Sequence, residues 1–438
     1  MHKALNTRIL SLYSYRRVAA VLTVTCLVGC GGSGDDGKVT ANSGNGELST
    51  PEAFQGTNLH RGPTVVAGGD DGSAVLLALT DQGIVTSAYN GEDESWRPVE
   101  STALLTVHKA QAGDDPSVPT SSTRVEGAAA TSSAAWVAVR ECLPEGVLID
   151  DSCGIGSSVV TVGRLDNGAK AWNPIVVSTD SAISSEGSVL REGTNVGARL
   201  FGSEDQVILV LNAPSMPSEI WSVGADGDAK RIGPGIDGVV DGVCAVGDSL
   251  YVVSSTLSPD GADQDSTEAQ LYPSAMLQRL PAALDKSADP EAIQLERMDV
   301  AGVPDATYGV LCDGTQIVIR GHEKTASVRP GDSKATPVET PELKFPFVNG
   351  GYSAGGHTGN TAGYLVGYDM EANRSQVIVS GIKDGAVAHH SFESPGLVGE
   401  VATVALADGS VLFTQSITDA PAPDETKPRR IAINVVAL

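Results

Sequence analysis

Short runs of Val, Ile, Leu and Ala recur along the chain, and a few Gly, Asp or Asn residues separate one run from the next. Dipeptides such as Asp-Gly and Asn-Gly suit tight hairpin turns because they tolerate positive φ. Each unit of run, turn and run therefore predicts two antiparallel strands joined by a hairpin. The clearest units cover residues 65–77, 243–253, 308–319 and 404–413, and further turns lie at 165–172, 224–229 and 382–386.

Apolar residues at helical spacing are rare in this sequence. The only fair helical candidate is the segment 268–284, and Pro273 and Pro281 interrupt it. Proline removes a backbone donor and clashes with the preceding turn of a helix. The pattern therefore predicts an all-β protein in which helices are minor.

Two consecutive hairpins make one four-stranded sheet, and such units recur at intervals of about 50 residues, a spacing that resembles that of β-propeller blades. We therefore expect a propeller of about seven blades; six or eight blades, or two β-sandwiches, are the alternatives. The apolar strand at 431–438 is expected to close the ring against the first blade. The units begin near residues 64, 131, 206, 241, 308, 361 and 402.

The first seventeen residues are basic and contain no acid, with Lys3, Arg8, Arg16 and Arg17 as the positive charges. An apolar run follows at 18–28. A bilayer-spanning helix needs about 20 apolar residues, so this run is too short to span and is typical of a signal peptide. The segment 14–18 also resembles the twin-arginine export motif, so both general and twin-arginine export stay open.

The apolar run ends in a motif that resembles the bacterial lipobox, formed by Leu27, Val28, Gly29 and Cys30. The resemblance implies that the Cys30 thiol receives diacylglycerol and that the chain is cleaved before it. Several acyl chains hold a protein at a membrane far better than one. We therefore expect residues 1–29 to be a lipoprotein signal peptide, 30–63 a flexible tether rich in Gly, Ser, Asn and Asp, and 64–438 the propeller domain.

A lipid-anchored chain of this kind would lie on the extracytoplasmic side of the cell membrane or outer membrane. Its formal net charge is −25, and residues 1–29 contribute no acid to that total. Such an acidic chain repels phosphate backbones, so nucleic acid is excluded as a partner. An envelope protein or a glycan is the expected partner, besides the membrane that holds the anchor.

Four cysteines remain after the signal peptide and the lipidated Cys30 are set aside: Cys142, Cys153, Cys244 and Cys312. An even number in an oxidising compartment indicates disulfides, and three pairings exist. Pairing of neighbours, Cys142 with Cys153 and Cys244 with Cys312, is favoured. On the propeller, Cys244 and Cys312 would lie on corresponding inner strands of successive blades. Their spacing is not that of a zinc site.

Three further motifs have ordinary structural interpretations. The residues 351–355 match the GxSxG pattern of a nucleophile elbow around Ser353, but no helix can start after them, so a loop between strands is favoured. The segment 165–172 resembles the repeat of quinoprotein-type propellers, which implies that Trp172 packs between blades. The acids at 260–268 do not have EF-hand spacing. No metal or cofactor is therefore expected.

Together these features predict a lipid-anchored binding or scaffold protein of the cell envelope. The sequence supplies no residues to which catalysis can be assigned. The alternative is a hydrolase or lyase that acts on glycans with acids at the centre of the ring.

Overall fold

We analysed a computed structural model of the whole chain, which describes the following residues: 46–48, 51–54, 64–67, 73–80, 83–90, 95–105, 123–142, 158–177, 197–203, 206–212, 217–256, 274–285, 288–289, 292–304, 309–321, 324–339, 343–345, 347–353, 361–369, 371–395, 397–405, 410–418, 430–436 and 438. The expected signal peptide, the lipobox and Cys153 lie outside them.

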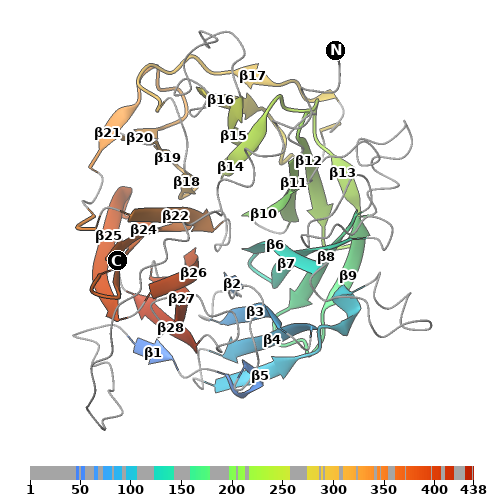
Figure 1. Cartoon of the computed structure of the whole chain (residues 1–438). Helices are drawn as coiled ribbons and strands as arrows, with labels where there is room; N and C mark the ends of the chain where they lie inside the picture. Colours follow the sequence, from blue (N-terminus) through green and yellow to red (C-terminus); the bar gives the residue numbers. More distant parts are fainter. Residues whose placement is uncertain are drawn as a thin grey trace, which may run out of the picture. The chain divides into compact units, whose positions relative to one another are not determined.

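Seven antiparallel four-stranded sheets form a seven-bladed β-propeller (Figure 1). The number of blades agrees with the sequence prediction, and the arrangement is not a pair of sandwiches. Blades 1 to 4 consist of β2 (Thr64–Ala67), β3 (Ala74–Thr80), β4 (Gly83–Asn90) and β5 (Ser95–Val99); β6 (Thr123–Ala130), β7 (Ala134–Cys142), β8 (Ser158–Asp166) and β9 (Asn173–Val177); β10 (Gly197–Ser203), β11 (Gln206–Asn212), β12 (Glu219–Gly224) and β13 (Ala229–Arg231); and β14 (Val239–Val246), β15 (Ser249–Thr256), β16 (Ser274–Leu280) and β17 (Glu296–Arg297).

Blades 5 to 7 repeat the same order from the centre outward. They consist of β18 (Gly309–Cys312), β19 (Ile317–Arg320), β20 (Thr325–Val328) and β21 (Thr336–Val338); β22 (Phe347–Ser353), β23 (Ala362–Asp369), β24 (Arg374–Lys383) and β25 (Ala386–Pro395); and β26 (Leu397–Ala405), β27 (Val411–Thr418), β28 (Arg430–Val436) and β1 (Gly46–Leu48). Two short 3-10 helices, η1 (Glu52–Phe54) and η2 (Thr102–Leu104), complete the described elements.

The strand pairs of the predicted hairpins are all present, and the turns that the structure describes use the residues that the sequence pattern indicated. Gly168, Gly227 and Gly314 have φ of +79°, +89° and +77°, respectively. Asp384 and Gly385 between β24 and β25 also have positive φ. Glycine reaches this region without the steric cost that a Cβ atom imposes, so the Asp-Gly dipeptides fix the hairpin positions.

The ring is closed by the first strand of the chain. β1 pairs antiparallel with β28, and Gly46 to Leu48 face Val435 to Ile433. The terminal strand therefore closes against a strand that precedes blade 1, within the segment that was expected to be tether. The nearby Phe54 is buried in the core cluster of blades 1 and 2. The folded unit thus begins by residue 46, because the outer edge of β28 needs a partner.

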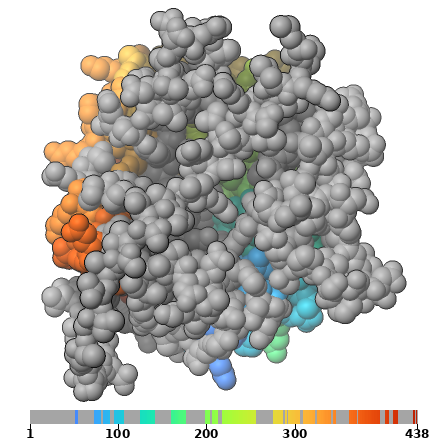
Figure 2. Space-filling view, in the orientation of Figure 1, coloured from blue at the N-terminus to red at the C-terminus, as the bar shows by residue number. Residues whose placement is uncertain are grey.

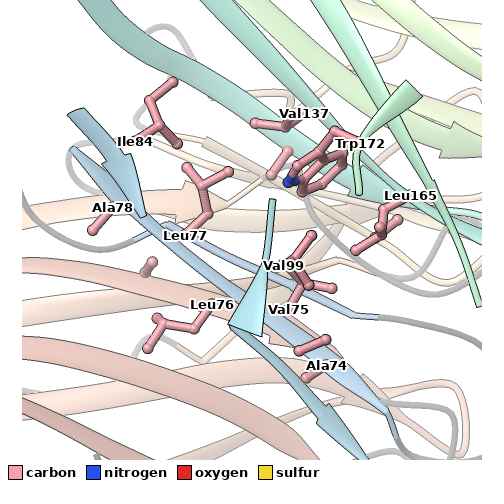
Figure 3. Close-up of a cluster of buried hydrophobic side chains, with 14 of the residues drawn as sticks. Ala74, Val75, Leu76, Leu77, Ala78, Ile84, Val99, Val137, Leu165 and Trp172 are labelled. Atoms are coloured by element: carbon pink, nitrogen blue, oxygen red, sulfur yellow. The ribbon is translucent and has the colours of Figure 1, made fainter. Parts of the chain in front are cut away.

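Hydrophobic side chains from neighbouring blades form the core (Figure 3). Between blades 1 and 2, Leu77 and Val99 pack near Val137, Leu165 and the ring of Trp172. The Nε1 of Trp172 donates to Thr86 Oγ1 in blade 1 at 3.2 Å, so this side chain joins the two blades as the resemblance implied. Burial of each large side chain stabilises the fold by about 1.5–3 kcal/mol.

The inner strands contain glycine where neighbouring blades approach one another. A Cβ atom on Gly127 would lie 2.9 Å from the backbone nitrogen of Leu200, and one on Gly242 would lie 2.6 Å from Val310 Cβ. Such contacts are too short for any larger residue. Crowding at the centre therefore requires small residues, and it weakens the apolar signal of these strands.

Three predicted blade starts were wrong. Blades 2, 3 and 6 begin at β6, β10 and β22, and not near residues 131, 206 and 361. Those positions lie at the turn or second strand of each blade, because the glycine-rich inner strand before it was missed. The helical candidate was also wrong, since Ser274–Leu280 forms the strand β16 between the two prolines. Within the described residues, no helix is long and apolar enough to cross a membrane.

A disulfide joins Cys244 on β14 to Cys312 on β18, as expected for the inner strands of successive blades. Both residues are buried, with 1% of their surface exposed. The bond closes a loop with a sequence separation of 68 residues. It therefore fixes blade 4 to blade 5 near the centre of the ring. The predicted pairing of Cys142 with Cys153 stays a prediction.

Candidate functional site

Two cavities lie on one face of the ring, which we call the hairpin face because it carries the turns between the first and second and between the third and fourth strands of each blade. The first, the 1–2 pocket, has a volume of about 270 Å³ and lies between blades 1 and 2. Its floor is apolar and buried, and consists of Ala74, Val75, Ala88, Ala135 and Leu165.

The rim of the 1–2 pocket is polar and comes from both blades. Blade 1 supplies Ser73, Tyr89, Asn90, Ser95 and Arg97, and blade 2 supplies Asp166, Asn167 and Gly168. The Tyr89 ring packs against Trp96 with centroids 5.1 Å apart. Arg97 donates through Nη1 to the carbonyl of Ala169, so it also fastens the two blades. The pocket therefore combines hydrogen-bond donors and acceptors with the aromatic ring of Tyr89.

The second cavity, the 3–4 pocket, has a volume of about 440 Å³. Its apolar part is formed by Ile232, Ala283, Leu284 and Ala288. Its polar residues are Ser133, Gln206, Ser222, Asp226, Asp228, Lys230 and Asp285. Three carboxylates against one ammonium group give this pocket a negative excess, which disfavours anionic ligands.

The two hairpin turns of blade 2 lie between the pockets, and each turn lines one of them. Ser133 lines the 3–4 pocket, and its carbonyl accepts a hydrogen bond at 3.1 Å from the backbone of Asn167, which lines the 1–2 pocket. The two cavities are therefore neighbours on one surface rather than unrelated hollows.

Arg164 on β8 connects the walls of the same two cavities. Its Nη2 lies 2.6 Å from Asp166 Oδ1 in the rim of the 1–2 pocket. Its Nη1 donates to the carbonyl of Ala225 in the 3–4 pocket at 2.8 Å. The guanidinium also lies over the Trp136 ring, 5.6 Å from its centroid. Charge-assisted bonds of this kind hold both rims in place without occupying either cavity.

A second polar region follows the inner strands at the centre of the ring. The ladders of β6 and β14 shift register at Glu126 and Asp241, so these acids occupy β-bulges, which re-aim side chains. Glu126 forms an ion pair with Arg140, with Oε1 2.7 Å from both Nε and Nη2. Asp241 accepts a hydrogen bond from Ser255, and its carbonyl accepts one from Arg199 at 2.8 Å.

In the space-filling view the face of the ring is hollowed at its centre, where atoms in the blue to green colours of the first blades are visible (Figure 2). The alternative interpretation as a glycan-acting hydrolase or lyase requires acids that converge on this centre. Three acids lie on the inner strands, Glu126, Asp241 and Glu400, and each stands where its ladder shifts register. The side chains of Glu126 and Asp241 hold Arg140 and Ser255. Their geometry is that of strand-fixing interactions.

Two motifs that could suggest nucleophilic chemistry have structural roles. Ser353 of the GxSxG match is the last residue of β22 and pairs with Ala362 of β23, so residues 351–353 belong to a strand, whereas a loop was expected, and residues 354 and 355 lie outside the described residues. Ser380 lies 2.8 Å from Nδ1 of His389 on the neighbouring strand β25. The serine is 2% exposed and thus inaccessible to a substrate. Neither serine has the setting that the chemistry requires.

The partly exposed His389 links blade 6 to blade 5, since its Nε2 lies 3.4 Å from the carbonyl of Glu339. Burial lowers the pKa of His389, and the charge of Arg320 acts in the same direction, whereas the Glu339 carbonyl opposes them. The native state therefore binds this proton less readily than the unfolded chain.

We expect this histidine to make the protein less stable as the pH falls. The contribution of neutral His389 to the free energy of unfolding is fully present above the pKa of the unfolded chain, near 6.5. It is lost as the pH falls through the lowered pKa of the folded protein. The urea midpoint measured between pH 8 and pH 5 should fall less steeply in His389→Gln than in the wild type. Equal slopes for the two proteins would contradict the assignment.

The remaining sequence-based site residues divide between the ring and the part of the chain that is not described. Leu27, Val28, Gly29, Cys30 and the acids at 260–268 lie outside the described residues. Among the described residues, no group of three or more His, Cys, Asp or Glu side chains could hold a metal ion. Sequence reasoning missed both pockets, although their rims use the Asp-Asn and Asp-Gly-Asp turns that it identified.

No protein-family model and no curated protein matches this chain. Among solved structures it is similar to an ulvan lyase of polysaccharide lyase family PL25, with 11% identity, a TM-score of 0.45, and coverage of 87% of this chain and 94% of that one. It is also similar to the BP39L lectin from Burkholderia pseudomallei, with 10% identity, a TM-score of 0.45, and coverage of 86% and 96%. TolB from Acinetobacter baumannii has 11% identity, a TM-score of 0.37, and coverage of 86% and 79%. These likenesses concern the fold alone.

Proposed function

We propose that this protein is a lipid-anchored binding module of the bacterial cell envelope, which presents its propeller to a glycan or a protein partner on the extracytoplasmic side. The observation that carries the binding part is the pair of neighbouring cavities on the hairpin face, each with an apolar surface and a polar rim. Concave sites of this composition are typical of small-molecule and glycan binding.

The anchor part of the proposal rests on the sequence from Leu27 to Cys30, which ends a short apolar run behind a basic segment. The disulfide between Cys244 and Cys312 is consistent with an oxidising compartment, where such bonds persist. Glu126 and Asp241 are engaged in contacts that hold strands, which disfavours a hydrolase or lyase that would use these two acids.

A Cys30→Ala variant tests the anchor. In cells grown with labelled palmitate, the wild type should carry label and fractionate with membranes, because its thiol receives the acyl chains. The variant should carry none, and it should accumulate as an unprocessed or released species.

Cys26→Ala is the matched control, since Cys26 lies within the expected signal peptide and should be dispensable for labelling. A wild-type protein that is fatty-acid-free, or whose mature form begins elsewhere than at Cys30, would refute the anchor.

A further inference from the structure

The surface formed by the two pockets and the turns between them is suited to an extended ligand with repeating units. The 1–2 pocket and the 3–4 pocket lie on either side of the blade 2 turns, and Arg164 holds a wall of each. A ligand that leaves one cavity over Ser133 and Asn167 therefore enters the other. Two linked contacts on one polymer raise the affinity above that of either contact alone.

The composition of each pocket indicates what kind of unit fits. A sugar ring has apolar C–H surfaces and a rim of hydroxyl groups that donate and accept hydrogen bonds. In the 1–2 pocket the apolar floor of Val75 and Leu165 lies below amide, carboxylate, guanidinium and hydroxyl groups. The half-buried Tyr89 adds an aromatic ring to the lining, which suits the apolar C–H surface of a sugar. A volume of about 270 Å³ lies near the lower limit for ligand pockets.

The charges decide between neutral and acidic sugars. In the 1–2 pocket, Asp166 is paired with Arg164, and Arg97 in the rim donates to the Ala169 carbonyl, so this pocket has no excess of acid. In the 3–4 pocket, Asp226, Asp228 and Asp285 outnumber Lys230, and the whole chain carries a net charge of −25. Uronate or sulfate groups would be repelled at the second pocket, whereas uncharged hydroxyls can donate to its carboxylates.

We propose that the hairpin face binds an uncharged oligosaccharide or polysaccharide, with one segment in the 1–2 pocket and another in the 3–4 pocket. This inference deepens the proposed binding function and depends on it. Asn167 supplies an exposed amide at the first pocket, and Asp228 an exposed carboxylate at the second.

The test uses the detergent-solubilised full chain and measures binding by titration calorimetry. The probes are hexasaccharides of glucose, mannose and N-acetylglucosamine, the matching disaccharides, and oligogalacturonate as the acidic comparison. We expect at least one neutral hexasaccharide to bind, more tightly than its disaccharide and than oligogalacturonate.

Single variants locate the site. Asn167→Ala and Asp228→Ala should each weaken hexasaccharide binding about fivefold to tenfold, since each removes one polar contact. Neither change alters a backbone group, so circular dichroism and the urea midpoint should match the wild type. Lys170→Ala is the matched control, because Lys170 is exposed in the same hairpin as Asn167 but does not line the pocket.

Three results would overturn the inference. No neutral hexasaccharide binds, oligogalacturonate binds more tightly than the neutral sugars, or Asn167→Ala and Asp228→Ala bind the hexasaccharide as tightly as Lys170→Ala does. The outcome is separate from that of the anchor test. If Cys30 is labelled but no sugar binds, the proposal of an anchored binding module stands and the sugar ligand is refuted. If sugar binds but Cys30 is not labelled, only the anchor is refuted.

Discussion

Replacement of Glu126 by Ala is expected to lower the free energy of unfolding by about 3–5 kcal/mol. Glu126 holds Arg140, whose side chain is only 4% exposed. Removal of the carboxylate leaves the guanidinium buried without its counter-charge, and one of its nitrogens, Nη1, already has no hydrogen-bond partner. The cost of an unpaired buried charge exceeds what the pair itself contributes.

A double variant separates these two contributions. Glu126→Leu with Arg140→Met removes both charges, so it should be more stable than Glu126→Ala. The control is Glu296→Ala, which breaks an ion pair with Arg279 in which both side chains are well exposed. Exposed pairs contribute about 0–1 kcal/mol. Urea unfolding followed by tryptophan fluorescence measures all three, and a Glu126→Ala loss as small as that of Glu296→Ala would contradict the prediction.

Removal of the disulfide by Cys244→Ala with Cys312→Ala should cost about 4 kcal/mol. The bond closes a loop with a separation of 68 residues, and the chain-entropy model assigns about this value to the lost restriction of the unfolded chain. Both positions are buried, so the shorter side chains also leave a small cavity.

Without reductant, the unfolding midpoint of this variant should lie well below that of the oxidised wild type. When both proteins are unfolded in dithiothreitol, the variant should lie only slightly below the wild type, because the cavity is then the remaining difference between them. Non-reducing peptide mapping of the wild type should recover Cys244 with Cys312 and Cys142 with Cys153. A fragment that pairs Cys142 with Cys244 would contradict both assignments.

The blade number and the hairpins were predictable because their signals are local. An Asp-Gly turn between apolar runs specifies a hairpin wherever it occurs, and the turns at 165–172, 224–229 and 382–386 are present in the structure. The inner strand β6 was harder to predict, because its Gly127 is required by the close approach of blade 3 and interrupts the run of apolar residues. Sequence periodicity does not record that crowding.

The pockets could not be located from the sequence because each is made by residues of different blades. Tyr89 and Asn167 share one cavity although the strands β5 to β8 lie between them along the chain. The turn residues were visible as turns, but only the packing of one blade against the next makes them into a rim. In the same way, the partner of β28 was not predictable from the composition of residues 30–63, because a three-residue strand leaves almost no pattern.

The closure of the ring by β1 has a mechanical consequence. Among the described residues, tension that reaches the propeller from the direction of Cys30 arrives first at Gly46, and three residue pairs hold β1 to β28. The short β1–β28 pairing therefore bears the force before the longer strand pairs of the blades do. If it is peeled away, the outer edge of β28 is bared while the other six blades keep all four strands, so a pulled molecule would yield at blade 7 first.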